Sequence, residues 1–307
     1  MAPIVEACAH AAARALGARY GLEDPALGVR LEGGYANDLF RLDAGGRAWV
    51  LRIERPPIDE ESLAWEHAVL GQLCERLPEV CAPVTARDGT TWFAVRDRVA
   101  WLMPLVRGAP ADPGRTAHRD AAASALGRIH AVGAELGLAP RPRHEALPRM
   151  TWPPLEPAAP LADFAEEIAA ARAWAVDFVR RLAAERRPRE GFVHNDFFPG
   201  NVMIDGDELT AVLDWEESRL DWVSFDLANA LGSFCFAGDE LDRGAARRFL
   251  TTYRDAGGTA PLDEEDLLLP LMRVKRTLEV LRAPTDREPR WEHQRHNVRA
   301  MTELARK

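Results

Sequence analysis

The chain has 307 residues, of which 47% are hydrophobic, and its 39 basic and 48 acidic residues give a formal charge of −9 at pH 7. This length and composition predict a globular protein with enough core for two lobes. The acidic balance argues against a nucleic-acid partner, and no apolar run approaches the length of a membrane-spanning helix.

The first hundred residues predict a small sheet. Apolar runs at 29–31, 39–42 and 49–53 have the length and composition of strands. Gly33 and Gly34 lie between the first two runs, where the absence of a Cβ lets backbone N–H groups approach a phosphate closely. An ordinary hairpin turn is the alternative for this pair.

A carboxylate on an apolar stripe marks the helix predicted at 60–77. Glu66 shares this stripe with four leucines, at positions 63, 70, 73 and 77. A carboxylate on a core face is costly unless it is paired, and Arg52 on the preceding strand is the obvious partner. The two residues predict either a phosphate-clamping pair or a purely structural ion pair.

A strand at 101–108 is followed by mostly helical sequence. Apolar positions at helical spacing predict helices over 161–185 and 267–282. His130 lies in another helical segment and is predicted to be a core histidine rather than a catalyst. The stretch 138–157, rich in Pro and Arg, is interpreted as an exposed connection or a lid on the substrate side.

The predicted helix at 267–282 carries basic residues elsewhere around its circumference. They indicate a solvated basic face or, alternatively, contact with an anionic group near an active site. These residues are Arg273, Lys275, Arg276 and Arg282.

The stretch from His194 to Asn201, with Asp214 beyond it, carries the groups that phosphoryl transfer needs. Two apolar runs, at 202–204 and 209–213, flank a turn signal and predict a hairpin. The start of one antiparallel strand lies beside the end of the other, so we expect Asn201 and Asp214 to be neighbours.

The residue types in this stretch suit one chemistry. The oxygens of Asn201 and Asp214 are hard ligands of the kind that Mg²⁺ accepts, together with phosphate and water. Asp196, on the loop that enters the hairpin, can accept the proton of an attacking hydroxyl. His194 and Pro199 would shape this loop.

These residues resemble the aminoglycoside phosphotransferase family, whose superfamily also contains choline and ethanolamine kinases, type II homoserine kinases and methylthioribose kinase. The family pattern is close to H-G-D-x₄-N, an apolar strand, D-[WF] and a later D-L-A. The chain matches it at His194, Asp196, Asn201, Asp214-Trp215 and Asp226-Leu227-Ala228.

The chain departs from this pattern at two places. Asn195 replaces the usual Gly, and Phe197-Phe198 replaces the usual Leu-His pair. Asn also adopts the left-handed conformation that Gly often supplies, so the loop can keep its shape. The two Phe residues would give the acceptor site an apolar wall or pack against the core.

The resemblance implies an α+β protein kinase-like fold with two lobes. An N-terminal lobe at 1–106, with a small antiparallel sheet, would bind the nucleotide and end in a hinge at 103–108. A mostly helical lobe at 107–307 would hold the catalytic and substrate-binding groups. There Asp196 would be the catalytic base, Asn201 and Asp214 the metal ligands, and Asp226 a structural acid that braces the loop, with His194 beside it.

The expected cofactors are ATP, or GTP, and Mg²⁺. By resemblance, a glycine loop would cover the phosphates, and a strand cation held by a helix acid would neutralise them. In the hinge, one side chain would border the base, one carbonyl would accept from it and one N–H would donate. The glycine loop contains Gly33 and Gly34, the strand cation is Arg52 and the helix acid is Glu66. In the hinge, the side chain is that of Met103, the carbonyl is that of Pro104 and the N–H is that of Val106.

The acceptor has several candidate ligands. Acids that follow the metal-binding Asp214 would form a pocket for an aminoglycoside, choline or another amino alcohol, or would be solvated loop acids. These acids are Glu216, Glu217 and Asp221. Aromatic side chains would instead stack on a nucleoside or a macrocyclic antibiotic. These side chains are Phe197, Phe198, Trp215 and Trp222.

We therefore expect a cytoplasmic kinase that phosphorylates a small-molecule hydroxyl, favoured to be that of an antibiotic or related metabolite, and that is a monomer or a homodimer. The metabolic alternative is an amino-alcohol or homoserine kinase, for which Arg219 or the helix near Arg273 would bind the carboxylate. An inactive nucleotide-binding protein is a third possibility. A protein kinase is disfavoured, because only eleven residues separate Asp214 from Asp226, too few for a long activation loop.

Four cysteines complete the sequence observations. Their spacing fits neither a CxxC pair nor a zinc site. Together with the absence of a signal-peptide pattern, this favours reduced thiols. The cysteines are Cys8, Cys74, Cys81 and Cys235.

Overall fold

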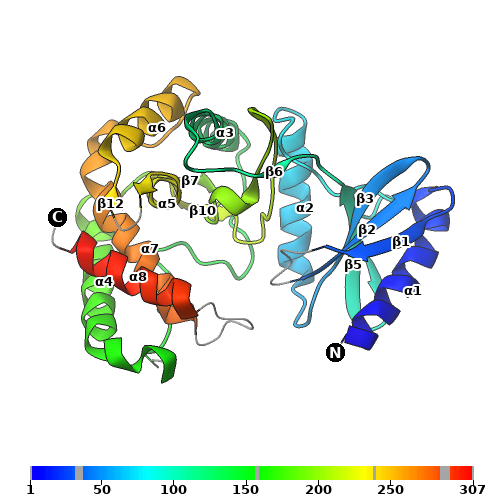
Figure 1. Ribbon diagram of the computed structural model, residues 1–307, viewed down its shortest axis with the longest axis horizontal. Helices are drawn as coiled ribbons and strands as arrows, with labels where there is room; N and C mark the ends of the chain where they lie inside the picture. Colours follow the sequence, from blue (N-terminus) through cyan, green and yellow to red (C-terminus); the bar gives the residue numbers. More distant parts are fainter. Residues whose placement is uncertain (1, 32–36, 156–158, 238–239, 284–290, 306–307) are drawn as a thin grey trace. The chain divides into compact units, whose positions relative to one another are not determined.

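The computed structural model divides the chain into two compact units, Met1–Arg107 and Gly108–Lys307 (Figure 1). Within them, the structure describes residues 2–31, 37–155, 159–237, 240–283 and 291–305.

Unit 1 is built on a five-stranded antiparallel sheet in the order β1-β2-β3-β5-β4. The strands predicted at 29–31, 39–42 and 49–53 overlap the first three strands of this sheet. The predicted strand at 101–108 starts inside β5 and extends past its end. The observed strands are β1 (Ala26–Arg30), β2 (Asp38–Ala44), β3 (Arg47–Ile53), β4 (Phe93–Val95) and β5 (Arg98–Pro104).

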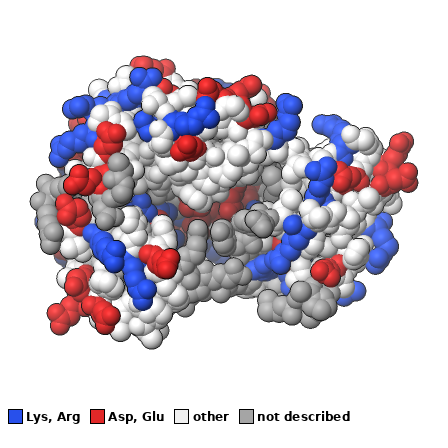
Figure 2. All heavy atoms as spheres, viewed as in Figure 1, with Lys and Arg blue, Asp and Glu red and all other residues white. Residues whose placement is uncertain are grey.

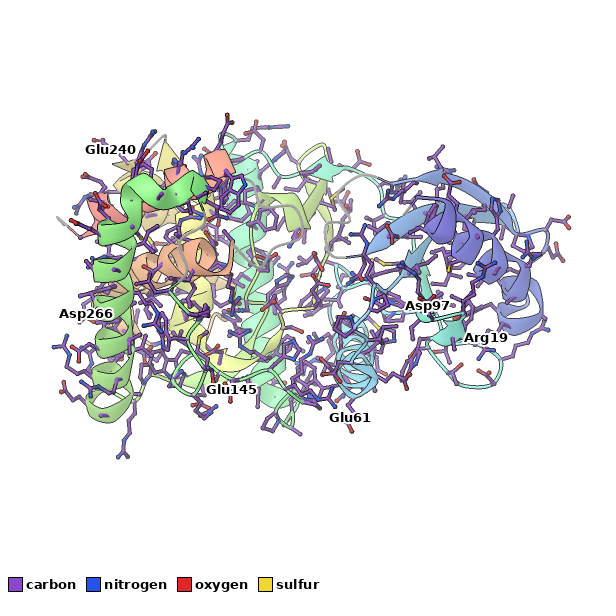
Figure 3. The ribbon with its side chains drawn as sticks, turned by 90° about the horizontal axis from the view of Figure 1, so that it is seen from below. Arg19, Glu61, Asp97, Glu145, Glu240 and Asp266 are labelled. Atoms are coloured by element: carbon purple, nitrogen blue, oxygen red, sulfur yellow. The ribbon has the colours of Figure 1, made fainter. Side chains whose placement is uncertain are left out.

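Helix α1 (Ala2–Tyr20) covers one face of this sheet (Figure 1). The sequence patterns do not predict α1, because its alanine-rich surface gives little contrast between an apolar and a polar side. Its Cys8 and Leu16 are completely buried in the core that the helix forms with the sheet. Near its end, Arg19 (Figure 3) lies 5.0 Å from the ring centroid of Phe93 on β4.

Helix α2 (Glu60–Cys74) packs against a second group of sheet residues. Asp59 caps it by accepting from the Ser62 N–H at 3.2 Å. The ring of His67 on α2 lies 4.7 Å from that of Trp101 on β5, and the strand register places Trp101 opposite Arg52 on β3. Arg52 and Trp101 therefore belong to the face of the sheet that α2 contacts.

Unit 2 is mostly helical. Its described helices include α5 (Val223–Phe234), which is buried on nearly every side and packs against α7. Pairs α3–α6 and α7–α8 are also packed together, as Figure 1 shows for the latter. The helices around α5 are α3 (Thr116–Glu135), α4 (Ala165–Glu185), α6 (Arg243–Asp255), α7 (Leu268–Arg282) and α8 (Trp291–Leu304), with the 3₁₀ segments η1 (Ala159–Phe164) and η3 (Leu262–Leu267).

Contacts between helix ends tie this unit together. Asp266 on η3 lies beside the C-terminal end of α4 (Figure 3), where Arg186 donates to it at 3.1 Å. The predicted helices at 161–185 and 267–282 correspond to η1 with α4 and to α7. The predictions do not include α6 or α8.

Short strands carry the loops of unit 2. The first pair is β7 (Glu190–Val193) with β10 (Arg219–Trp222), and a three-stranded sheet has the order β6-β8-β9. Its hairpin closes on Gly206 at φ +66°, in the predicted turn. The strands of this sheet are β6 (Ala109–Pro110), β8 (Val202–Asp205) and β9 (Glu208–Val212), after the 3₁₀ turn η2 (Pro199–Asn201); β11 (Phe236–Ala237) pairs with β12 (Glu240–Leu241).

The segment 138–157 is interpreted as an exposed connection or lid, and its described part, 138–155, is irregular but partly internal. Arg141, Ala146 and Leu147 are buried. The Arg141 guanidinium donates to the carbonyls of Trp215 and Ser218 at 3.0 and 3.1 Å. These bonds correct the exposed interpretation for this part, because a buried arginine and its carbonyl partners hold it against the unit.

Surface charge is mixed. Figure 2 shows Lys and Arg interspersed with Asp and Glu over the face that it draws. Among the described residues, no helix is both long enough and apolar enough to cross a bilayer. The four cysteines are free thiols.

Candidate active site

The loop after β7 is fixed by a buried carboxylate. Asp226 on α5 accepts the N–H groups of His194 and Asn195, each at 2.8 Å. His130 lies 3.0 Å from the same carboxylate and 2.8 Å from the Tyr253 hydroxyl. Burial acts to raise the pKa of Asp226, but the His130 hydrogen bond and the two histidines outweigh it and lower that pKa.

His194 has a supporting position. Its side chain is completely buried, and Nε2 lies 3.0 Å from the Leu213 carbonyl, where it can donate. Its ring packs at 4.5 Å from that of Trp215. Burial lowers the pKa of His194, which keeps the imidazole neutral and suits it to packing.

Asn195 occupies the position where the family pattern has Gly. Its φ is +65°, the left-handed conformation that the sequence comparison expects of this position. Its carbonyl accepts from the Lys275 ammonium at 3.1 Å. With the amide oxygen turned to face Arg219, that oxygen accepts from the guanidinium at 2.9 Å. The backbone and side chain of Asn195 thus contact three other elements.

Asp196 follows Asn195 on this loop and is half-buried in an environment of mixed charge. Burial raises the pKa of Asp196 to about 6; the Lys275 ammonium opposes this rise, and the carboxylates of Asp214, Glu217 and Glu279 add to it. A carboxyl with this pKa is a better base than an ordinary aspartate and is still largely ionised at neutral pH.

The hairpin brings the two expected metal ligands together. Val202 on β8 pairs with Val212 on β9, and the Leu213 N–H donates to the Asn201 carbonyl at 2.8 Å. Asp214 follows at φ +62°. The Asn201 amide nitrogen donates to the Asp196 carboxylate at 3.1 Å. The predicted hairpin and the neighbourhood of these residues are therefore present in the structure.

The expected acceptor residues divide into two groups. Phe197 is completely buried, with its ring 6.0 Å from that of Phe234, and Trp222 is also buried. Phe198 is half-buried beside Gly200, where a Cβ would lie 2.5 Å from the Phe198 ring. Trp215 is buried, so the aromatic residues other than Phe198 are packing residues rather than walls of a site.

Asp221 is likewise structural rather than a ligand for an acceptor. It is completely buried, and its oxygens accept from the Leu147 N–H, the Trp222 N–H and the Arg219 guanidinium at 2.8–3.0 Å. Glu216 and Glu217, by contrast, are half-buried.

The basic residues of α7 correct another expectation. Lys275 and Arg276 are not on a solvated face: their side chains are 12% and 15% exposed and donate to the carbonyls of Asn195 and Gly232. Arg273 lies 3.9 Å over the Trp174 ring. Helical spacing alone does not reveal that the Asn195 carbonyl, on the loop after β7, faces Lys275.

In unit 1, Arg52 has its own carboxylate neighbour. Its Nε donates to Glu54 at 2.9 Å, and its guanidinium lies 5.3 Å from the Trp101 ring centroid. Glu66 on α2 is 4% exposed, in agreement with its place on the apolar stripe. The sequence reasoning missed Glu54, which lies two residues from Arg52 on the same side of the strand.

The structure describes the predicted hinge residues but not the glycine loop. Met103, Pro104 and Val106 are half-buried at the end of β5, where Trp49 pairs with Pro104. Gly33 and Gly34 lie outside the described residues.

The buried carboxylate of Asp38, on β2, is surrounded by three arginines, a cluster that sequence spacing does not reveal. They are Arg30, Arg55 and Arg98.

Comparison with known proteins identifies the family. Residues 28–264 match the phosphotransferase enzyme family. The chain belongs to this family. It is 28% identical over 243 residues to a homoserine kinase of Bradyrhizobium sp. (strain ORS 278), an alignment that covers 78% of this chain and 73% of that protein.

Solved structures show the fold. An amicoumacin kinase, solved in complex with AMP-PNP, Ca²⁺ and Ami, has a TM-score of 0.76 at 15% identity, over 99% of this chain and 96% of that one. A microcompartment-associated aminopropanol kinase has a TM-score of 0.71 at 17% identity, over 96% and 93%. The predicted α+β kinase-like fold and the predicted family are confirmed, and the protein is a small-molecule phosphotransferase.

Proposed function

We propose that this protein transfers the γ-phosphoryl group of ATP to a hydroxyl of a small molecule, with Mg²⁺ as cofactor. The observation that supports this most directly is the assembly of Asp196, Asn201 and Asp214 at one end of the β8–β9 hairpin. A base and two hard-oxygen ligands are the protein groups that such a transfer requires.

Asp196 acts on the acceptor. Its carboxylate orients the hydroxyl and accepts its proton, while the acceptor oxygen forms a bond to the γ-phosphorus. The bond from that phosphorus to the bridging oxygen breaks, and ADP leaves with the electron pair. The proton on Asp196 then passes to water. Asp226, through the N–H groups of His194 and Asn195, holds the loop in place for this step.

The residues present fit Mg²⁺. Asn201 uses its amide nitrogen on Asp196, so its oxygen is the atom that would hold the ion with Asp214. Among the described residues, no group of three or more His, Cys, Asp and Glu side chains could hold a metal, and Mg²⁺ sites with few protein ligands are completed by phosphate and water. Bound Mg²⁺ supplies positive charge at the phosphate oxygens.

Unit 1 would contribute the groups that bind the nucleotide. Arg52, held by Glu54 and placed on the same face as α2, is the proposed phosphate cation, with Glu66 supporting it. The backbone at Pro104 and Val106 would contact the base beside Met103, and Gly33 and Gly34 would cover the phosphates. ATP is favoured because a relative in fold is solved with AMP-PNP; GTP is the alternative.

Two classes of acceptor deserve a direct test. An antibiotic or related metabolite is supported by the fold relative named an amicoumacin kinase, and an amino-acid or amino-alcohol acceptor by the homoserine kinase and aminopropanol kinase relatives. A screen of ADP release with both classes, each with product detection by mass spectrometry, separates them. An inactive nucleotide-binding protein would bind ATP and show no acceptor-dependent turnover.

The Asp196→Ala variant tests the proposed base. We expect kcat to fall by about 10²–10⁴-fold, because the base is lost, with little change in the Kd for ATP. The matched control is Asp207→Ala, which removes a carboxylate that is 64% exposed in the β8–β9 turn. Near-normal turnover in Asp196→Ala would rule out this assignment.

A further inference from the structure

We propose that the acceptor is a zwitterion, a small hydroxy amino acid whose ammonium group binds Glu217 and whose carboxylate binds Arg282. The inference rests on the proposed function and deepens it by naming the chemical class of the acceptor. It follows from a network of contacts that runs from the catalytic loop to a half-exposed pair of opposite charges.

The network begins at Asn195, the neighbour of the proposed base. Its side-chain oxygen accepts from Arg219, and Arg219 lies 3.3 Å from the Glu217 carboxylate. Glu217 in turn lies 3.8 Å from the Arg282 guanidinium at the end of α7. The pair is therefore joined to Asp196 through two residues.

The surroundings of this pair differ from the expected acidic pocket. Burial acts to raise the pKa of Glu217, but the cations Arg282, Arg219 and Lys275 outweigh it and lower that pKa. Cations as well as acids surround this pair, so a polycation would meet repulsion as well as attraction. A ligand that carries one charge of each sign meets a partner for both.

Exposure separates the groups that can meet a ligand from those that support them. The side chains of Glu217 and Arg282 are 41% and 40% exposed, whereas those of Arg219 and Lys275 are 5% and 12% exposed. The buried cations are held by Asp221 and by the Asn195 carbonyl. The two half-exposed charges are therefore the ones that an acceptor can contact.

The Glu217–Arg282 pair is suited to exchange. At 3.8 Å it is longer than a direct charge-assisted hydrogen bond. The ammonium and carboxylate of an α-amino acid are close neighbours on one carbon, so one can bind Glu217 while the other binds Arg282. Each protein charge then keeps an opposite partner, and the planar guanidinium offers two N–H groups to the carboxylate.

The backbone turn that carries Glu217 is also held in place. Its turn is closed by the Ser218 N–H, which donates to the Trp215 carbonyl at 2.9 Å. The buried Arg141 donates to the carbonyls of both residues. Because the backbone that carries Glu217 is fixed, less freedom is lost when its side chain binds an ammonium group, which favours its use in recognition.

Three acceptors that keep the spacing between the hydroxyl and each charged group isolate the two charges. L-homoserine has both, 3-aminopropan-1-ol lacks the carboxylate, and 4-hydroxybutanoate lacks the ammonium group. With the full-length protein and saturating MgATP, we expect kcat/KM for L-homoserine to exceed that of each analogue about tenfold or more, the effect of one charged hydrogen bond. Equal values for the three would overturn the inference.

Two variants give a crossed pattern that a merely structural role would not produce. Glu217→Gln should lower kcat/KM about tenfold for L-homoserine and 3-aminopropan-1-ol and leave 4-hydroxybutanoate unchanged. Arg282→Gln should lower it for L-homoserine and 4-hydroxybutanoate and leave 3-aminopropan-1-ol unchanged. Controls are Glu265→Gln and Arg254→Gln, which disrupt another partly exposed ion pair of unit 2. A uniform loss for all three acceptors overturns the inference.

The acceptor assays also distinguish a failure of this inference from a failure of the proposed function. If an aminoglycoside or macrolide is phosphorylated with dependence on Asp196 and L-homoserine is not, the proposed function stands and the zwitterion is wrong. If no acceptor is turned over, calorimetry with AMP-PNP and Mg²⁺ decides. Binding of L-homoserine that is lost in both Gln variants supports the site, and no binding contradicts it.

Discussion

Asn195 shows how a departure from a family pattern can be used. A glycine there would supply the left-handed backbone and the N–H to Asp226, but it has no side chain for Arg219. Asn tolerates φ +65° at low cost and adds that contact. The loop that carries the proposed base is therefore bonded to Asp226 on α5, to Lys275 on α7 and to Arg219 on β10 through one residue.

The pKa of Asp196 predicts the acid side of the pH profile. Burial raises this pKa to about 6, and a base acts only when it is ionised, so kcat/KM should fall about tenfold per pH unit below about 6. The profile of kcat should turn at lower pH, because bound Mg²⁺ favours the carboxylate.

The measurement is initial rate against pH with each substrate in turn varied. Thermal unfolding over the same pH range is the control, since loss of folded protein would imitate a titration. A kcat/KM profile that stays flat down to about pH 4, the range of an ordinary aspartate, would contradict the assignment.

At the scale of elements, α3 and α6 pack unusually closely. A Cβ added to Gly127 on α3 would lie 2.4 Å from the Tyr253 carbonyl and 3.0 Å from Ala256 Cβ. This close approach lets the Tyr253 hydroxyl reach His130, which contacts Asp226. The distance between two helices thus helps to determine the position of the catalytic loop.

Gly127→Ala should therefore destabilise unit 2. Alanine raises helix propensity by up to about 1 kcal/mol, but the clash with backbone costs about 1–3 kcal/mol, so the clash prevails. The control is Gly71→Ala on α2, where a Cβ meets nothing within 4 Å and stability should rise. Chemical denaturation of both variants measures the difference, and equal gains in stability would show that α3 can shift freely.

Sequence reasoning performed well where the signal is local. The hairpin after Asn201 has its turn residues, its apolar runs and its flanking ligands within a short segment, and the structure contains all of them. It failed for α1, because an alanine-rich helix has little amphipathic contrast, and for Lys275 and Arg276, because their carbonyl partners are remote in sequence. Asp221 looked like a loop acid, and its amide partner at Leu147 lies in a segment interpreted as exposed.

For the whole molecule, ligand binding should appear as stability. If MgATP binds only the folded chain, it adds about 2.7 kcal/mol to the free energy of unfolding at a ligand concentration of 100 Kd. We expect a rise in Tm with ATP and Mg²⁺ that is largely lost when EDTA removes the metal. In Asp214→Asn the dependence on Mg²⁺ should weaken, because a charged ligand becomes neutral. The same rise with and without metal would argue against Asn201 and Asp214 as the cation site.

The contact between Lys275 and the Asn195 carbonyl has a consequence for chemistry done on this protein. The sequence contains only two lysines, Lys275 and Lys307, among its 39 basic residues, and Lys307 is the last residue given. An amine-selective reagent therefore has few side-chain targets, and one of them lies against the catalytic loop. Lys275 is only 12% exposed, so it should react slowly, and acylation of its ammonium group would remove its charge and its bond to the loop.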